Sequence, residues 1–104
     1  MDPAPEFSVT RRRVGATVVV APAGEIDLAT VDAVKREIEG AGEHVVLDLR
    51  EVTFIDSAGL RLVLECSRAV PDFAVVPGPR EVRRVFDLVG LGERVPMLDA
   101  PPDG

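Results

Sequence analysis

Stretches of apolar residues, either alternating with polar ones or running unbroken, predict five strands along the chain. Residues 7–13 alternate in character as an edge strand does, and the β-branched run 17–21 predicts a second strand that forms a hairpin with the first. Apolar residues nearly fill 44–49, which is typical of a central strand covered on both faces. Shorter apolar runs at 73–76 and 95–98 predict two more strands, the last at a sheet edge because it contains a proline.

Between these runs, apolar residues recur every three or four positions, which is the period of a helix with one buried face. This pattern predicts helices over 28–38, 57–70 and 80–89, each followed by a glycine or proline that ends it. Residues 22–24 are expected to break the second strand, and residues 50–56 to form a short turn. The resulting order, β-β-α-β-α-β-α-β, predicts an α/β fold: a small two-layer sandwich in which a mixed sheet carries its helices on one face.

The composition favours one small domain and disfavours several classes of partner. Of the 104 residues, 46% are hydrophobic, which is enough to build a core. The formal net charge of -6 and the absence of Trp and Tyr disfavour nucleic acid, whose binding needs positive charge and stacking platforms. The longest uncharged stretch, residues 14–24, is about half the length of a membrane-spanning helix, so we expect no membrane partner.

The two ends of the chain differ in composition from its middle. Residues 1–6 are acidic and proline-rich without the features of a signal peptide, and they predict a disordered leader. Residues 7–99 form the predicted domain, and residues 100–104 a flexible tail. The single cysteine, Cys66, fits a reducing compartment, so we expect a cytoplasmic protein, and a monomer because nothing in the sequence indicates an oligomer.

Ser57 is the residue most suited to chemistry, because it follows a strand and a turn at the expected start of a helix. Free backbone N–H groups and the helix dipole favour negative charge there, so its hydroxyl is well placed to accept a phosphate. The residues alone leave open whether Ser57 is such an acceptor or only a helix N-cap, worth about 1 kcal/mol. A Ser-His triad within one chain is excluded, because the only histidine, His44, begins a strand whose length alone separates it from Ser57 by roughly 20 Å.

Three acidic residues surround this candidate in the predicted fold. Asp48 interrupts an apolar strand and must find partners, most simply backbone N–H groups of the loop before Ser57, so we expect it to shape that loop. Glu25 and Asp27 follow the second strand and are expected at the same sheet edge as Ser57, either in a solvated turn or in contact with a partner. The sequence contains no P-loop and no credible cluster of metal ligands.

Three blocks of the sequence resemble the STAS domains of bacterial anti-sigma-factor antagonists. The first is Gly-Glu-Ile-Asp at 24–27, and the second runs from Leu-Asp-Leu at 47–49 to Asp-Ser-Ala-Gly-Leu at 56–60. The third is Arg-Arg-Val-Phe-Asp-Leu-Val-Gly-Leu at 83–91. The blocks have the order and spacing of that family, and the resemblance covers about residues 7–98. Arg61 departs from it, since many relatives have a small residue at that position.

The resemblance implies an STAS-like sandwich that acts as a regulator rather than an enzyme and needs no cofactor. The unphosphorylated chain would bind an anti-sigma factor and so release a sigma factor. That anti-sigma factor would be a serine kinase of the histidine-kinase-like ATPase fold, whose phosphorylation of Ser57 switches binding off, and a PP2C-type phosphatase would restore it. The implied partner-binding residues are Glu25, Asp27, Thr30, Asp56, Ser57, Ala58, Gly59, Leu60 and Arg61.

Two other functions remain open. One is an STAS scaffold or ligand-sensing module of a signalling complex, in which Ser57 is never phosphorylated. The other is nucleotide binding or hydrolysis by the domain itself, which the absence of a P-loop lysine disfavours.

Overall fold

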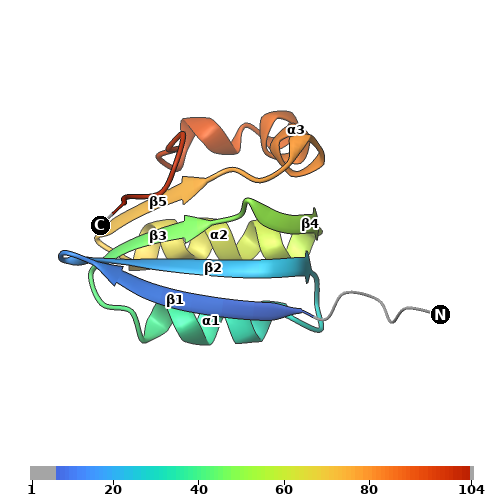
Figure 1. The fold of residues 1–104 in the computed structure, drawn as a ribbon. Helices are drawn as coiled ribbons and strands as arrows, with labels where there is room; N and C mark the ends of the chain where they lie inside the picture. Colours follow the sequence, from blue (N-terminus) through green and yellow to red (C-terminus); the bar gives the residue numbers. More distant parts are fainter. Residues whose placement is uncertain (1–6, 104) are drawn as a thin grey trace.

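A computed structural model describes residues 7–103 of the chain (Figure 1). Strands and helices alternate along this part of the chain, and a short 3-10 helix follows the last α-helix. The elements are β1 (Ser8–Val14), β2 (Thr17–Ile26), α1 (Val31–Glu39), β3 (His44–Asp48), β4 (Glu51–Ile55), α2 (Ser57–Ala69), β5 (Asp72–Val76), α3 (Arg80–Val89) and η1 (Leu91–Glu93).

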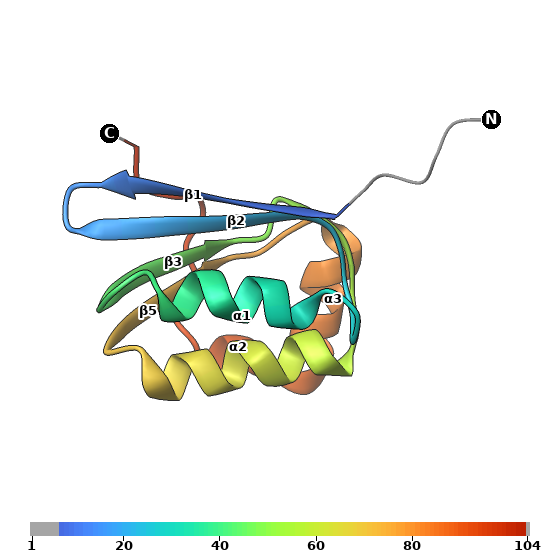
Figure 2. The same cartoon turned by 90° about the horizontal axis from the view of Figure 1, so that it is seen from below.

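The sheet is mixed, and the long strand β2 organises it. β1 pairs antiparallel with β2, while β3 pairs parallel with both β2 and β5, giving the order β1-β2-β3-β5. β4 also pairs parallel with β2, but with its second half, so β3 and β4 follow one another along the same edge of β2. Figure 2 shows the helices on one side of this sheet. The predicted fold class, a mixed sheet with helices on one face, is confirmed.

Two segments that were expected to be turns belong to strands. Residues 51–55 form β4, in which Val52 and Ile55 are buried while the residues between them are exposed. Residues 22–24 continue β2 rather than break it. Pro22 is tolerated in this strand because β3 pairs with β2 only as far as Val20 and β4 begins to pair with it at Ala23.

The predicted last strand is reduced to a single parallel bridge between Met97 and Val75. The Val75 N–H donates to the Pro96 carbonyl at 2.9 Å, and the Leu98 N–H donates to the Val75 carbonyl at 2.8 Å. The order within the described residues is therefore β-β-α-β-β-α-β-α, with one more strand in the middle and one fewer at the end.

The main core lies between the sheet and its helices. Its most buried side chains come from the inner face of the strands and from all three helices, among them Val20, Leu47, Val75, Val34, Ile38, Leu62, Val63 and Phe86. This burial of aliphatic surface is the main source of stability for the domain. No helix within residues 7–103 is long and apolar enough to cross a membrane.

The opposite face of the sheet carries a second, smaller cluster of Val19, Val46 and Val76. Leu98 packs against this cluster. Farther along, the Pro102 carbonyl accepts a hydrogen bond from Arg12 Nη2 on β1 at 3.2 Å. The described part of the predicted tail, residues 100–103, therefore contacts the sheet. The predicted leader, residues 1–6, and Gly104 lie outside the described residues.

Candidate functional site

Two loops meet at the carboxyl end of β2 and β4, and they carry most of the predicted site residues. Ile26 and Ile55, the last residues of the two strands, are direct partners in the parallel ladder. The pairing continues one residue further, because the Asp56 N–H donates to the Ile26 carbonyl at 3.2 Å. The chain then turns into α1 from one loop and into α2 from the other. The segment around Asp27 and that around Ser57 therefore lie side by side.

Asp56, rather than Ser57, caps α2. Asp56 Oδ1 accepts hydrogen bonds from the N–H groups of Ala58 at 2.9 Å and Gly59 at 3.3 Å. Ser57 is the first residue of the helix, its side chain is exposed, and its hydroxyl has no hydrogen-bond partner among the described residues. The alternative that Ser57 serves as the N-cap is therefore wrong. The cap contribution of about 1 kcal/mol belongs to Asp56, and the Ser57 hydroxyl is available for chemistry.

Asp27 and Thr30 build the neighbouring loop. Asp27 Oδ1 accepts from the N–H groups of Ala29 at 2.9 Å and Thr30 at 3.2 Å. Thr30 Oγ1 donates to the Glu25 carbonyl at 2.8 Å and accepts from the Asp27 N–H at 3.0 Å. These bonds hold residues 27–30 in a turn, so α1 begins at Val31 rather than at residue 28 as predicted.

Gly59 joins the two loops through the first turn of α2. It is buried, and a Cβ atom at this position would lie 2.5 Å from Ile55 Cγ1 and 3.0 Å from Ile26 Cγ2. Because glycine has no side chain, the helix can approach the ends of both β2 and β4. The absence of a side chain at Gly59 thus serves the packing of α2 against β2 and β4 within the domain.

A groove of about 310 Å³ opens beside Ser57, between α2 and the segment formed by the end of α3 and η1. Its walls are apolar except at Ser57 and at two arginines. The lining residues are Ser57, Leu60, Arg61, Leu64, Val89, Leu91 and Arg94. Sequence reasoning missed Val89 and Arg94, which lie more than thirty positions from Ser57 and reach this groove only through the packing of α3 and η1.

Asp48 lies at the end of β3 and is 6% exposed. It accepts hydrogen bonds from the backbone N–H of Arg50 at 3.1 Å and from that residue's Nε and Nη2, each at 3.0 Å. The hydrogen bond and the charge of Asp48 raise the pKa of Arg50 above its ordinary value. The contact lies between the end of β3 and the start of β4. Only one of the expected backbone N–H partners is present within residues 7–103, that of Arg50, and the main partner is the guanidinium group of the same residue.

No histidine among the described residues lies near Ser57. His44 Nδ1 lies 3.0 Å from Asp72 Oδ2 at the beginning of β3, whereas Ser57 follows the far end of β4. Burial raises the pKa of the Cys66 thiol to about 11, so this thiol stays protonated at neutral pH and is a poor nucleophile. No group of three His, Cys, Asp or Glu side chains within residues 7–103 is placed to hold a metal ion.

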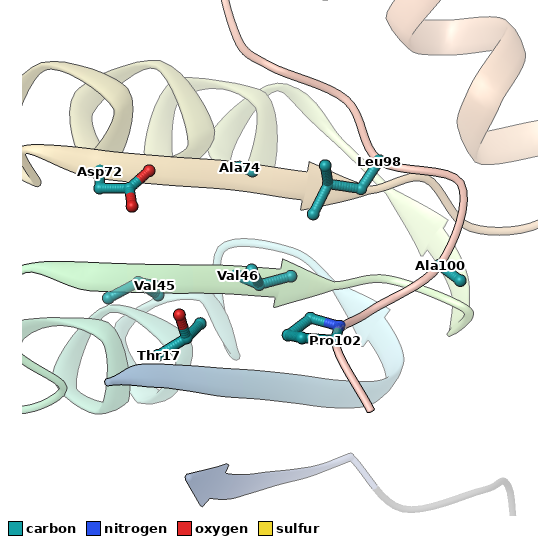
Figure 3. Close-up of a pocket in the computed structure, with 8 residues that line it drawn as sticks. All are labelled: Thr17, Val45, Val46, Asp72, Ala74, Leu98, Ala100 and Pro102. Atoms are coloured by element: carbon teal, nitrogen blue, oxygen red, sulfur yellow. The ribbon is translucent and has the colours of Figure 1, made fainter. Parts of the chain in front are cut away.

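A second concave region lies on the other face of the sheet, beneath the C-terminal segment (Figure 3). It encloses about 360 Å³, and most of its walls are apolar. Thr17 and Asp72 supply its polar side chains, and the other lining residues are Val45, Val46, Ala74, Leu98, Ala100 and Pro102. None of the predicted site residues lines this region.

The arrangement of the two loops can be compared with known proteins. The family model of the STAS domain matches residues 8–101 of the chain. The chain belongs to the STAS domain family. The family resemblance predicted from the three sequence blocks is therefore confirmed.

Relatives of this STAS domain carry the names of regulators. It is 31% identical over 91 residues to an anti-sigma F factor antagonist from Paenibacillus polymyxa, covering 79% of this chain and 78% of that protein. The crystal structure of an anti-sigma factor antagonist from Mycobacterium paratuberculosis matches with a TM-score of 0.81 and 25% identity, over 91% of this chain and 87% of that one.

Solved structures of SpoIIAA in two states also match this STAS domain. The anti-sigma factor antagonist SpoIIAA in its unphosphorylated form gives a TM-score of 0.68 at 26% identity, over 88% of each chain. The Bacillus cell fate determinant SpoIIAA in the phosphorylated form gives a TM-score of 0.64 at 24% identity, over 89% of this chain and 91% of that one. This match shows a similar fold.

Proposed function

We propose that this STAS domain is an anti-sigma factor antagonist whose binding is switched off by phosphorylation of Ser57. The observation that carries the proposal is the exposed, unbonded hydroxyl of Ser57 on a helix that Asp56 caps. A phosphate can be added there without removing any hydrogen bond of the fold. The names of the relatives support the regulatory role, since they are antagonists of anti-sigma factors.

In this proposal the unphosphorylated domain binds an anti-sigma factor in the cytoplasm and so releases a sigma factor. The anti-sigma factor is a serine kinase of the histidine-kinase-like ATPase fold. Ser57 Oγ attacks the γ-phosphorus of ATP held by that kinase, the bond to the bridging oxygen breaks, and ADP leaves. The hydroxyl proton passes to a base of the kinase. A PP2C-type phosphatase hydrolyses the ester, and this domain is a substrate rather than an enzyme.

The surface around Ser57 has the features of a protein contact. Leu28 is 81% exposed at the tip of the loop before α1, and Val89 is 53% exposed beside the groove. Ala58 and Arg61 line the shallow depression that Leu28 borders, so apolar and charged groups flank Ser57 together. Exposed aliphatic side chains at the centre with charged groups at the rim are typical of protein interfaces.

The predicted partner-binding residues divide into two groups by their surroundings. Glu25, Ser57 and Arg61 are exposed, and Ala58 and Leu60 are partly exposed, so these five are proposed to touch the partner. The other four are engaged within the domain and are proposed to hold the two loops in shape; they are Asp27, Thr30, Asp56 and Gly59. Asp48 is proposed to shape the chain between β3 and β4.

Phosphorylation places about 1.5 to 2 negative charges at the centre of this surface. A loss of about 3 kcal/mol of binding free energy is enough to weaken the complex more than a hundredfold. We therefore expect Ser57→Asp to bind the anti-sigma factor at least a hundredfold more weakly than wild type, as measured by calorimetry. Ser57→Ala should bind but gain no phosphate from kinase and ATP.

Ser8→Asp is the matched control, because it adds the same charge at an exposed serine on β1. It should bind as wild type does. Equal affinity of Ser57→Asp and wild type would contradict the switch. Intact mass of the protein from its native cells supplies the second test, since a phosphate adds about 80 Da. Its absence under both resting and stressed conditions would favour the alternative, a scaffold or ligand-sensing STAS module.

A further inference from the structure

Two arginines share the groove beside Ser57. Arg61 lies four residues after Ser57 in α2, and side chains at this spacing are neighbours on one helix face, about 6 Å apart at their Cβ atoms. Arg94 comes from the opposite wall, directly after η1. Ser57, Arg61 and Arg94 therefore line one groove from two separate parts of the chain.

Both guanidinium groups are available for a new partner. Arg61 and Arg94 are exposed, and neither forms an ion pair with a carboxylate within residues 7–103. The rest of the groove lining is Leu60, Leu64, Val89 and Leu91, all of them apolar. The groove therefore offers two positive charges with no acidic side chain among the described residues of its lining.

Most backbone donors at the helix N-terminus are already engaged, and of the first four only the N–H of Ser57 itself has no partner among the described residues. The N–H groups of Ala58 and Gly59 already donate to Asp56 Oδ1, and the Leu60 N–H donates to the Asp56 carbonyl. The Asp56 carboxylate also repels a second anion beside it. The strongest remaining donors at this groove are the two guanidinium groups, which bind phosphate through paired, charge-assisted hydrogen bonds.

Building on the proposed function, we propose that this groove is an internal receptor for the phosphate of phosphorylated Ser57, held between Arg61 and Arg94. Binding there occupies the end of the groove next to Ser57 and ties the first turn of α2 to the segment after η1. The phosphorylated domain then presents a groove whose two positive charges are neutralised and whose end next to Ser57 is occupied. The switch acts by covering the contact surface as well as by adding charge.

The test uses the full chain with phosphoserine installed at position 57 by genetic code expansion, and it needs no partner protein. The phosphate is titrated by phosphorus NMR and compared with phosphoserine in a peptide of residues 53–61, whose second pKa is near 6. Arg61 and Arg94 lower this pKa, whereas Asp56 and the acidic Glu25 and Asp27 of the neighbouring loop raise it; the α3 wall is the apolar Val89. We expect a value below that of the peptide.

Arg61→Gln and Arg94→Gln should each raise the pKa of the phosphate by about half a unit, and the double variant by more. Arg61→Lys should recover only part of the shift, because lysine keeps the charge but lacks the planar fork. Arg80→Gln is the matched control, since it removes one exposed arginine at the start of α3, nine residues and about 13 Å before Val89. It should leave the titration unchanged.

A phosphate that titrates as in the peptide and responds to neither Gln variant would overturn the receptor. Equal effects of Arg80→Gln and Arg94→Gln would also overturn it, because they would reflect net charge alone. Failure of the receptor would not contradict the proposed function, because the switch could still work by repulsion and is tested separately by partner binding of Ser57→Asp. Conversely, if Ser57→Asp bound the partner as wild type does, the titration would still decide whether the phosphate is held by the two arginines.

Discussion

Two helices begin side by side in this domain, and their first turns are built from the same kinds of residue. α1 follows Asp27 and Thr30, whereas α2 follows Asp56 and begins with Ser57. In each, an aspartate Oδ1 accepts hydrogen bonds from two backbone N–H groups. The hydroxyl groups differ. That of Thr30 is bonded to the Glu25 carbonyl and the Asp27 N–H, whereas that of Ser57 is exposed and has no partner among the described residues.

The comparison separates a hydroxyl that builds the fold from one that is free to react. Residue type does not distinguish them, because Thr and Ser are both phosphate acceptors and both favoured near helix starts. Their surroundings do. The Thr30 hydroxyl holds a turn together, so modifying it breaks that turn. The Ser57 hydroxyl can be modified while every hydrogen bond of the α2 cap remains in place.

The largest effect is expected where the two helix starts are joined. Gly59→Ala should lower the free energy of unfolding by about 2 kcal/mol. The added Cβ would clash with Ile55 and Ile26, and the cost of this clash exceeds the gain in helix propensity. Urea denaturation measures the change. Gly40→Ala is the control, since Gly40 has a φ of -83° and its Cβ would meet the flexible end of Arg11 at 3.1 Å and the Arg36 carbonyl oxygen at an ordinary contact distance of 3.6 Å. Similar losses in both variants would contradict the role of Gly59.

An intermediate effect on the free energy of unfolding is expected to distinguish the hydroxyl of Thr30 from that of Ser57. Thr30→Val keeps the shape of the side chain but removes the bonds to the Glu25 carbonyl and from the Asp27 N–H, so it should cost about 1.5 kcal/mol. Ser57→Ala should change the free energy of unfolding by less than about 0.5 kcal/mol. Both are read from denaturant unfolding curves of the unmodified protein. A larger loss for Ser57→Ala than for Thr30→Val would reverse the comparison.

The smallest effect concerns the cap itself. Asp56→Ala should cost about 1 kcal/mol because the N–H groups of Ala58 and Gly59 lose their acceptor. Asp56→Asn keeps an acceptor oxygen and should stay within a few tenths of a kcal/mol of wild type. Thermal unfolding of the two variants measures the difference. If Asp56→Ala were neutral and Ser57→Ala were not, the cap would belong to Ser57 after all.

Much of the fold could be predicted from the sequence because local patterns encode it. The hairpin, the central strand and three helices follow from the spacing of apolar residues. The strand β4 could not be recognised, because the charged Arg50 and Glu51 interrupt the apolar run and suggest a turn. The path of the C-terminal segment over the outer face depends on a single bridge at Met97, which leaves no periodic signal.

For the site, too, the sequence predicts where the loops lie but not their detailed contacts. The placement of the Asp27 and Ser57 loops at one sheet edge follows from parallel pairing of the strands before them. Which of two adjacent residues caps α2 depends on side-chain geometry that sequence does not specify. The contribution of Val89 and Arg94 depends on how α3 and η1 pack beside α2, a tertiary arrangement with no local pattern.

The division of labour between Asp56 and Ser57 also bears on how such domains evolve. Because the neighbouring aspartate holds the helix start, the Ser57 side chain makes no hydrogen bond on which the fold depends. A single codon change from serine to alanine then produces a stable domain that can no longer be modified, and the reverse change restores the hydroxyl. If the proposed switch operates, regulated and permanently active forms of the domain differ by this one mutation.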